Sequence, residues 1–195
     1  MIPAIFLVLC AVAYRIATGL MIHSGSTWLS NFAPFAALAL CSAAYFPGRL
    51  KFTVPFAALL LSDVVINAAY HAPIVDGIIL CRYLALAIVG LIGLAFQRRR
   101  SLATMIPASI IGSTVFYFIT NFFSWISDPG YVKNFAGLIQ SLTVGLTQYS
   151  ATPTWMFFRN SLVSDLIFTA AFVLCMSFGQ SSADTHARVT TPRPA

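Results

Sequence analysis

The sequence predicts an all-α membrane protein built around one helical domain. Hydrophobic residues make up 59% of its 195 positions, charged residues make up only 8%, and the mean hydropathy is +0.86. Soluble domains carry roughly 25% charged residues, so this composition argues against an ordinary soluble protein. The apolar residues also fall in runs that match the roughly 20 helical residues needed to cross a bilayer.

Six apolar runs follow one another along the chain, separated by short polar breaks. The first, residues 2–22, has no basic segment before it and no small-residue cleavage site after it, so we expect a retained span and not a signal peptide. The later runs cover residues 32–46, 52–70, 77–96, 102–126 and 156–178. We therefore expect six transmembrane helices in a single domain over residues 1–178.

Two further segments do not fit this pattern. Residues 135–150 mix apolar side chains with Gln140, Thr143, Thr147 and Gln148. This mixture favours a helix at the outer surface or over a cavity, and leaves open whether the segment spans. Residues 179–195 are polar and rich in Thr, Pro and Arg, which predicts a disordered tail.

The basic residues indicate an orientation. Lys and Arg number 11 against five acidic residues, giving a formal net charge of +6. In a membrane protein this excess bears on topology and not on nucleic-acid binding, because Lys and Arg collect in cytoplasmic loops. Arg49, Lys51 and the arginines at 98–100 share one side if the first four spans alternate. We expect that side and the N-terminus in the cytoplasm, with residues 24–30, 71–76 and 128–134 converging on a pocket at the other side.

The stretch 57–86 places ionisable groups inside apolar runs. Asp63 lies within the third span, and Arg15 and Asp165 lie within the first and last spans. An ionisable residue at membrane depth costs at least ~2.5–3.5 kcal/mol on insertion scales, so each such residue points to function by default. We expect Arg15 to pair with Asp63 or Asp165, unless these groups instead form a polar floor or a gate for a ligand.

The four cysteines are far apart and form no metal-ligand spacing. Cys10, Cys41, Cys81 and Cys175 give no CxxC pair, which argues against a protein-only zinc site and against a disulfide framework. Cys81 stands at the start of the fourth span beside Arg82, and both a cation and a helix N-terminus favour a thiolate. The alternative is that Cys81 is a small buried packing residue.

Several segments carry a resemblance to a known family. They are Ser30-Asn31-Phe32-Ala33-Pro34 with the apolar run after it, Ala44-Tyr45-Phe46, Leu61-Ser62-Asp63, Thr120-Asn121-Phe122 and Phe157-Phe158-Arg159-Asn160-Ser161-Leu162. These segments resemble small bacterial membrane proteins that are similar to the substrate-binding S components of energy-coupling-factor (ECF) transporters. Within that group the chain resembles the solitary BtuM-type cobalamin (vitamin B12) transporters.

This resemblance implies an ECF S-component-like bundle in the bacterial inner membrane, with both ends cytoplasmic and a vitamin pocket opening to the periplasm. It implies cobalamin as the bound substrate, Cys81 as axial cobalt ligand, and displacement of an upper ligand such as cyanide as a side activity. His71, Asp76, Arg82 and Tyr83 would contact the corrinoid, and Arg159 its nucleotide phosphate. An energising ECF module is the implied partner, although only Ala13 and Ala17 match the usual Ala-x-x-x-Ala pattern.

Other interpretations stay open. The loop residues His71 and Asp76 can be merely solvated, Arg159 can snorkel to the headgroups, and Tyr83 can anchor the membrane interface. The chain can be an S component for a smaller vitamin or precursor, with Cys81 in packing. It can be a membrane enzyme that uses the Cys81 thiolate with His71 as base, which requires about 3 Å between them, or an assembly subunit. It contains no GxxxxGK[ST] motif, so we expect energy from a partner or a gradient.

Overall fold

The computed structural model describes residues 2–23, 31–73 and 75–190, and every regular element in them is an α-helix. The helices are α1 (Ile2–His23), α2 (Phe35–Tyr45), α3 (Leu50–Ala69), α4 (Gly77–Ala95), α5 (Leu102–Ser127), α6 (Phe135–Leu142) and α7 (Thr154–Thr190). The all-α prediction is confirmed for this part of the chain. Of the helices described, α1, α3, α4, α5 and α7 are long and apolar enough to cross a membrane, so the fold is that of a multi-pass membrane protein.

The outer faces of these five long helices carry many large apolar side chains, whose exposure to water would be unfavourable. These exposed residues include Phe6, Leu9, Leu60, Leu61, Leu80, Leu84, Ile111, Phe118 and Ile167. Exposed apolar surface on this scale fits contact with lipid tails.

The expected six full-length spans are not confirmed. Helix α2 has 11 residues, which at 1.5 Å per residue is about 16 Å, roughly half of a 30 Å hydrocarbon core. The segment 135–150 does not form a spanning helix either, because α6 has eight residues and turns follow it. The structure therefore holds five long helices with one half-length helix among them.

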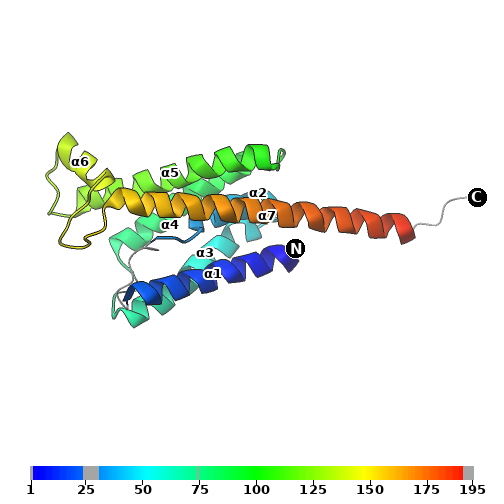
Figure 1. The fold of residues 1–195 in the computed structure, drawn as a ribbon, viewed down its shortest axis with the longest axis horizontal. Helices are drawn as coiled ribbons and strands as arrows, with labels where there is room; N and C mark the ends of the chain where they lie inside the picture. Colours follow the sequence, from blue (N-terminus) through cyan, green and yellow to red (C-terminus); the bar gives the residue numbers. More distant parts are fainter. Residues whose placement is uncertain (1, 24–30, 74, 191–195) are drawn as a thin grey trace, which may run out of the picture.

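The long helices lie side by side, with the start of α1 and the end of α7 at one end of the bundle and α6 at the other (Figure 1). The turns that carry Arg49 and the arginines at 98–100 join α2 to α3 and α4 to α5, at the end away from α6. The predicted alternation of the spans is therefore present, and the cytoplasmic location of the basic end stays a prediction. Of the three outer loops, residues 24–30 lie outside the described residues.

Local sequence explains where several helices begin. Asp76 caps α4, its Oδ1 accepting from the backbone N–H of Ile79 at 2.8 Å, and Asn134 caps α6 by accepting from Gly137 N–H at 2.9 Å. Ser101 precedes α5, and its N–H donates to Thr104 Oγ1 at 3.2 Å. Helix α7 ends its apolar part at Phe178, as expected, but continues to Thr190, where the sequence suggested a disordered tail.

The core is arranged around α2. Every residue from Phe35 to Ala44 is buried, and the helix packs against α3, α4, α5 and α7. Small side chains let helices approach closely in a membrane protein, where lipid offers no hydrophobic drive for association. The closest approach is at Gly93 of α4, where a Cβ atom would lie 2.3 Å from the carbonyl oxygen of Leu40.

We predict that Gly93→Ala destabilises the protein by about 1–3 kcal/mol, because the added methyl group forces α4 away from the backbone of α2. The measurement is the apparent melting temperature of the purified protein in detergent. Gly112→Ala is the matched control: its Cβ would meet only the Val89 side chain, at 3.1 Å, and alanine favours a helix over glycine by about 1 kcal/mol. Equal losses in both variants would contradict the close packing of α2 and α4.

Candidate functional site

A cavity of about 290 Å³ lies inside the bundle. It is lined by residues from α1, α2, α3, α4, α5 and α7 and from the segment before α2. Its polar lining consists of Arg15, Asn31, Arg82, Ser113, Tyr117, Thr120, Asn121, Ser124, Thr154, Ser161 and Asp165. Ligand pockets in proteins are usually about 300–1,000 Å³, so this cavity has the size of a site for a small molecule.

The cavity exists because α2 is short. Its lining includes Asn31, Ala33, Phe35 and Ala36, which end the preceding segment and begin α2. The neighbouring long helices continue past this point towards α6 (Figure 1). A full-length helix would have filled the space in the α6-side half of the bundle that the cavity now occupies.

One face of α5 supplies the largest share of the polar wall, five of its eleven residues. Ser113, Tyr117, Thr120, Asn121 and Ser124 recur at helical spacing and all line the cavity. Their donors are largely used within the helix: Thr120 Oγ1 bonds to Phe116 O at 3.0 Å and Asn121 Nδ2 to Tyr117 O at 2.8 Å. The side-chain oxygens therefore remain as acceptors towards the cavity.

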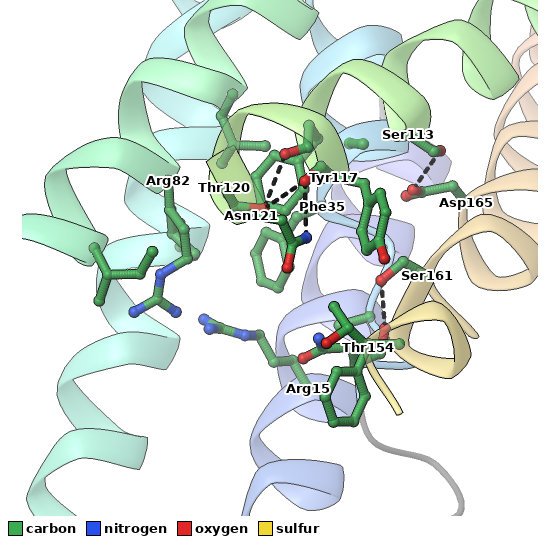
Figure 2. Close-up of a pocket in the computed structure, with 18 of the residues that line it drawn as sticks. Arg15, Phe35, Arg82, Ser113, Tyr117, Thr120, Asn121, Thr154, Ser161 and Asp165 are labelled. Carbon is green, nitrogen blue, oxygen red and sulfur yellow. Dashed lines mark hydrogen bonds between the residues drawn. The ribbon is translucent and has the colours of Figure 1, made fainter. Parts of the chain in front are cut away.

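A charged cluster forms the wall opposite Asp165. Arg15 Nη2 lies 2.7 Å from Asp63 Oδ1, and Arg82 Nη1 lies 3.7 Å from the same oxygen. Figure 2 shows both guanidinium groups on one side of the cavity. The Arg15–Asp63 pair predicted as one of two possibilities is present. The third member, Arg82, makes no hydrogen bond with any described residue, and its Nε is buried without a partner.

Asp165 closes the other side of the cavity. It is 1% exposed, its Oδ1 accepts from the backbone N–H of Ala37 at 2.8 Å, and its Oδ2 accepts from Ser113 Oγ at 2.7 Å (Figure 2). Ala37 lies in the first turn of α2, whose N-cap Pro34 has no capping side chain. Asp165 thus satisfies a backbone donor that cannot reach water.

The segment around α6 covers this end of the bundle and is tied to the cavity wall. Tyr117 OH donates to Leu142 O at 2.6 Å, and Trp125 Nε1 donates to Val132 O at 3.0 Å. Burial raises the pKa of Tyr131 in this segment, so its phenol stays neutral at physiological pH. The interpretation of residues 135–150 as a helix at the surface or over a cavity agrees with this arrangement.

Of the six site residues predicted from sequence, only Arg82 lines the cavity. Cys81 is 7% exposed, and its Sγ lies 3.8 Å from Ile119 O, which is a packing environment on α4. The Tyr83 ring packs against Phe56 with centroids 5.8 Å apart, and its hydroxyl is buried without a hydrogen-bond partner.

The other three predicted residues lie apart from the cavity lining. Asp76 is the N-cap of α4, and His71 is exposed in the turn after α3 with a φ of 52°. Arg159 is exposed on α7, with its guanidinium 5.7 Å from the Trp155 ring centroid and bonded to Asn160 Oδ1. The structure records no hydrogen bond between His71 and Cys81, the pair that the membrane-enzyme interpretation requires.

Sequence reasoning missed most of the cavity wall. The sequence analysis identifies Arg15 and Asp165 as charged residues within spans, but it does not predict that one face of α5 is polar and lines a cavity. A signal was present, because Ser113, Tyr117, Thr120, Asn121 and Ser124 follow the i, i+4, i+7, i+8, i+11 pattern of one helix face within an apolar span. Ser161 and Thr154 gave no such signal, since they stand near a helix start, where polar residues are common.

Comparison with known proteins shows the family. The model of a family of unknown function, DUF6580, matches residues 1–186, and the chain belongs to this family. No curated protein and no solved structure matches the chain. None of these comparisons links the chain to S components or to BtuM-type proteins, so that resemblance stays a prediction.

We predict that Asp63→Asn destabilises the protein by about 3 kcal/mol or more, because it leaves two guanidinium groups in the bundle without a counter-charge. The double variant Arg15→Gln/Asp63→Asn should lose less than the sum of the two single variants, since neither partner is then left alone. Unfolding in detergent measures all three. Asp128→Asn, at the partly buried end of α5, is the control and should stay within about 0.5 kcal/mol of the parent, because an asparagine Oδ1 can still accept from Gly130 N–H as Asp128 Oδ1 does at 2.7 Å. Strictly additive losses would contradict the pairing.

Proposed function

We propose that this member of the DUF6580 family is a substrate-binding membrane transporter whose cavity holds a small organic anion. The observation that carries the proposal is the guanidinium of Arg82, which lines the cavity, lies 3.7 Å from the Asp63 carboxylate that Arg15 already holds, and lacks a hydrogen-bond partner among the described residues. This corresponds to the interpretation as an S-component-like protein for a small vitamin or precursor.

The charges of the cluster support an anionic ligand. Arg15 and Arg82 share the single carboxylate of Asp63, and the 3.7 Å separation from Arg82 is longer than a hydrogen bond. One positive charge in this cluster is thus left without a close partner in a bundle that excludes most water. A carboxylate or phosphate would meet the planar guanidinium in a charge-assisted, bidentate contact.

The rest of the lining supports a ligand with an apolar body. Phe35, Phe116 and Phe157 line the cavity together with the acceptor-rich face of α5. Few polar groups set among apolar and aromatic walls are typical of small-molecule sites. An acid that carries a small ring or a short chain fits both walls.

The position of the cavity favours transport over a purely structural role. Ionisable side chains inside membrane helices that face a cavity mark substrate pathways.

Energy would come from a gradient or from a partner such as an ECF module. Ala13 and Ala17 are both exposed and lie four residues apart on α1, so one small-residue face of that helix is open to a partner helix.

Cobalamin is the second candidate, and it derives from the resemblance together with the burial of Cys81 next to Arg82. A corrinoid, with its macrocycle and nucleotide loop, is much larger than the cavity, and Cys81 does not line it. Cobalt ligation and decyanation by Cys81 would therefore need α4 and α5 to separate, because Cys81 Sγ packs against Ile119 O.

We predict that the purified full-length protein binds acids in preference to their neutral analogues. The probes are nicotinate with nicotinamide, pantothenate with pantothenol, and biotin with its amide, measured by thermal shift and calorimetry. Arg82→Gln should weaken binding of the preferred acid by about 10–100-fold, because a hydrogen bond to a charged group contributes about 1.5–3 kcal/mol. Arg159→Gln, the same change outside the cavity, should leave the affinity unchanged. Equal binding of acid and amide, or equal loss in both variants, would sink the proposal.

The cobalamin alternative has its own readout. If Cys81 ligates cobalt, the visible absorption spectrum of cobalamin shifts on binding to the parent protein and does not shift with Cys81→Ala. Cys175→Ala, a partly exposed cysteine, serves as the control and should keep the shift. On the small-anion proposal we expect no spectral shift with any of the three proteins.

A further inference from the structure

Asp165 lies near the middle of the membrane-spanning part of the bundle. It is eleven residues beyond Thr154, the first residue of α7, which is about 16 Å along the helix axis and roughly half of a 30 Å hydrocarbon core. Its side chain is 1% exposed and lines the cavity. A carboxylate held at this depth without a counter-ion is costly when ionised.

No such counter-ion is present among the described residues. The ion pairs recorded there join Asp63 to Arg15 and Arg82, and none includes Asp165. On the helices packed against α7, Cys41 of α2 interacts electrostatically with Asp165, while Arg15 of α1 and Tyr117 of α5 line the same cavity. Arg82 of α4 also lines it, and α6 carries no titratable side chain.

The hydrogen bonds around Asp165 suit both of its protonation states. Ser113 Oγ has one hydrogen and two acceptors within reach, Asp165 Oδ2 at 2.7 Å and Ser109 O at 2.9 Å. When Asp165 is ionised, Ser113 donates to it. When Oδ2 is protonated, the carboxyl O–H donates to Ser113 Oγ, and Ser113 donates to Ser109 O. Ala37 N–H donates to Oδ1 in either state.

The polar contacts continue beyond Ser113, one helical turn further from the cavity. Thr169 Oγ1 donates to Ser109 Oγ at 3.1 Å, and Cys41 Sγ lies 4.0 Å from Thr169 Oγ1. All three side chains are buried at the junction of α2, α5 and α7. Acidic residues that face the interior of a membrane bundle are typical of proton relays, and Asp165 is the acidic residue beside this cluster.

We infer that Asp165 is a proton-binding site inside the membrane and that its protonation is linked to occupation of the cavity by the anion. The linkage part rests on the proposed function. With Asp165 ionised, the two guanidinium groups of the cavity balance the two carboxylates of Asp63 and Asp165. Uptake of one proton by Asp165 leaves one positive charge in excess, and one bound monovalent anion restores neutrality. The cavity therefore takes up a proton and an anion together.

The proton-binding site is tested without any ligand. Infrared spectra of the full-length protein, recorded in lipid across the pH range in which it stays folded, should contain the C=O band of a protonated carboxyl group that disappears as pH rises. Asp165→Asn should lack this band, and Asp128→Asn should keep it. The absence of a titrating band in the parent protein, or its persistence in Asp165→Asn, overturns the inference.

A second set of variants covers the case in which Asp165→Asn does not fold. The chain has five acidic side chains, so the band can be assigned by elimination from Arg15→Gln/Asp63→Asn, in which neither partner of that pair is left alone, and from Asp76→Asn, Asp128→Asn and Asp184→Asn. A band that survives all four changes belongs to Asp165 or to the terminal carboxyl group. Amidation of the terminus by ligation separates these two, and loss of the band on amidation overturns the inference.

The linkage is tested with nicotinate and pantothenate at pH values where both probes stay ionised. Binding of the acid to the parent protein should weaken by up to about tenfold per pH unit once Asp165 loses its proton, and binding to Asp165→Asn should not depend on pH. An affinity independent of pH in the parent protein overturns the linkage, while anion binding itself stands. If none of the three acids named above (nicotinate, pantothenate and biotin) binds, the linkage and the proposed function both fail, and the infrared result alone decides whether Asp165 binds a proton.

Discussion

The structure depends on how the backbone N–H groups in the first turn of α2 find hydrogen-bond acceptors inside the bundle. This helix begins at Phe35, away from water, and its N-cap Pro34 offers no side-chain acceptor. In an apolar interior an unpaired backbone N–H costs several kcal/mol. Asp165 of α7 supplies the acceptor for Ala37 N–H across the helix interface. Because this contact lets α2 start halfway through the bundle, the longer neighbouring helices enclose a cavity where a full span would otherwise stand.

Charge balance then determines what the cavity can hold. The bundle places two arginines and two aspartates at membrane depth, but the distances between the opposite charges differ. Arg15 and Asp63 are in close contact, Arg82 lies further from the shared carboxylate, and Asp165 stands apart from both arginines. Two incompletely compensated groups therefore face each other across the cavity (Figure 2). Such an arrangement is costly for an empty protein and suits one that takes up charged species.

The segment around α6 is hydrogen-bonded to the wall of the cavity. Tyr117 belongs to the cavity wall and also holds the carbonyl of Leu142 at the end of α6. A ligand that displaced the Tyr117 ring would thereby act on the segment around α6. Cys81, in contrast, packs against Ile119 O of α5 and does not line the cavity. A role of Cys81 in ligand binding would require movement, whereas the roles proposed for Arg82 and Asp165 do not.

The sequence by itself determined the class of the protein, the long helices and the presence of charges at membrane depth. These follow from composition, from apolar run length and from the high cost of an ionisable group in lipid, which act locally along the chain. It also narrowed the partner of Arg15 to Asp63 or Asp165. Only the tertiary structure decided between them, showed that α2 is half a span, and brought Arg82, Asp165 and the polar face of α5 to one cavity while leaving Cys81 outside it. The reason is that helix rotation and depth are set by packing between residues far apart in sequence, such as Gly93 against Leu40 and Asp165 against Ala37.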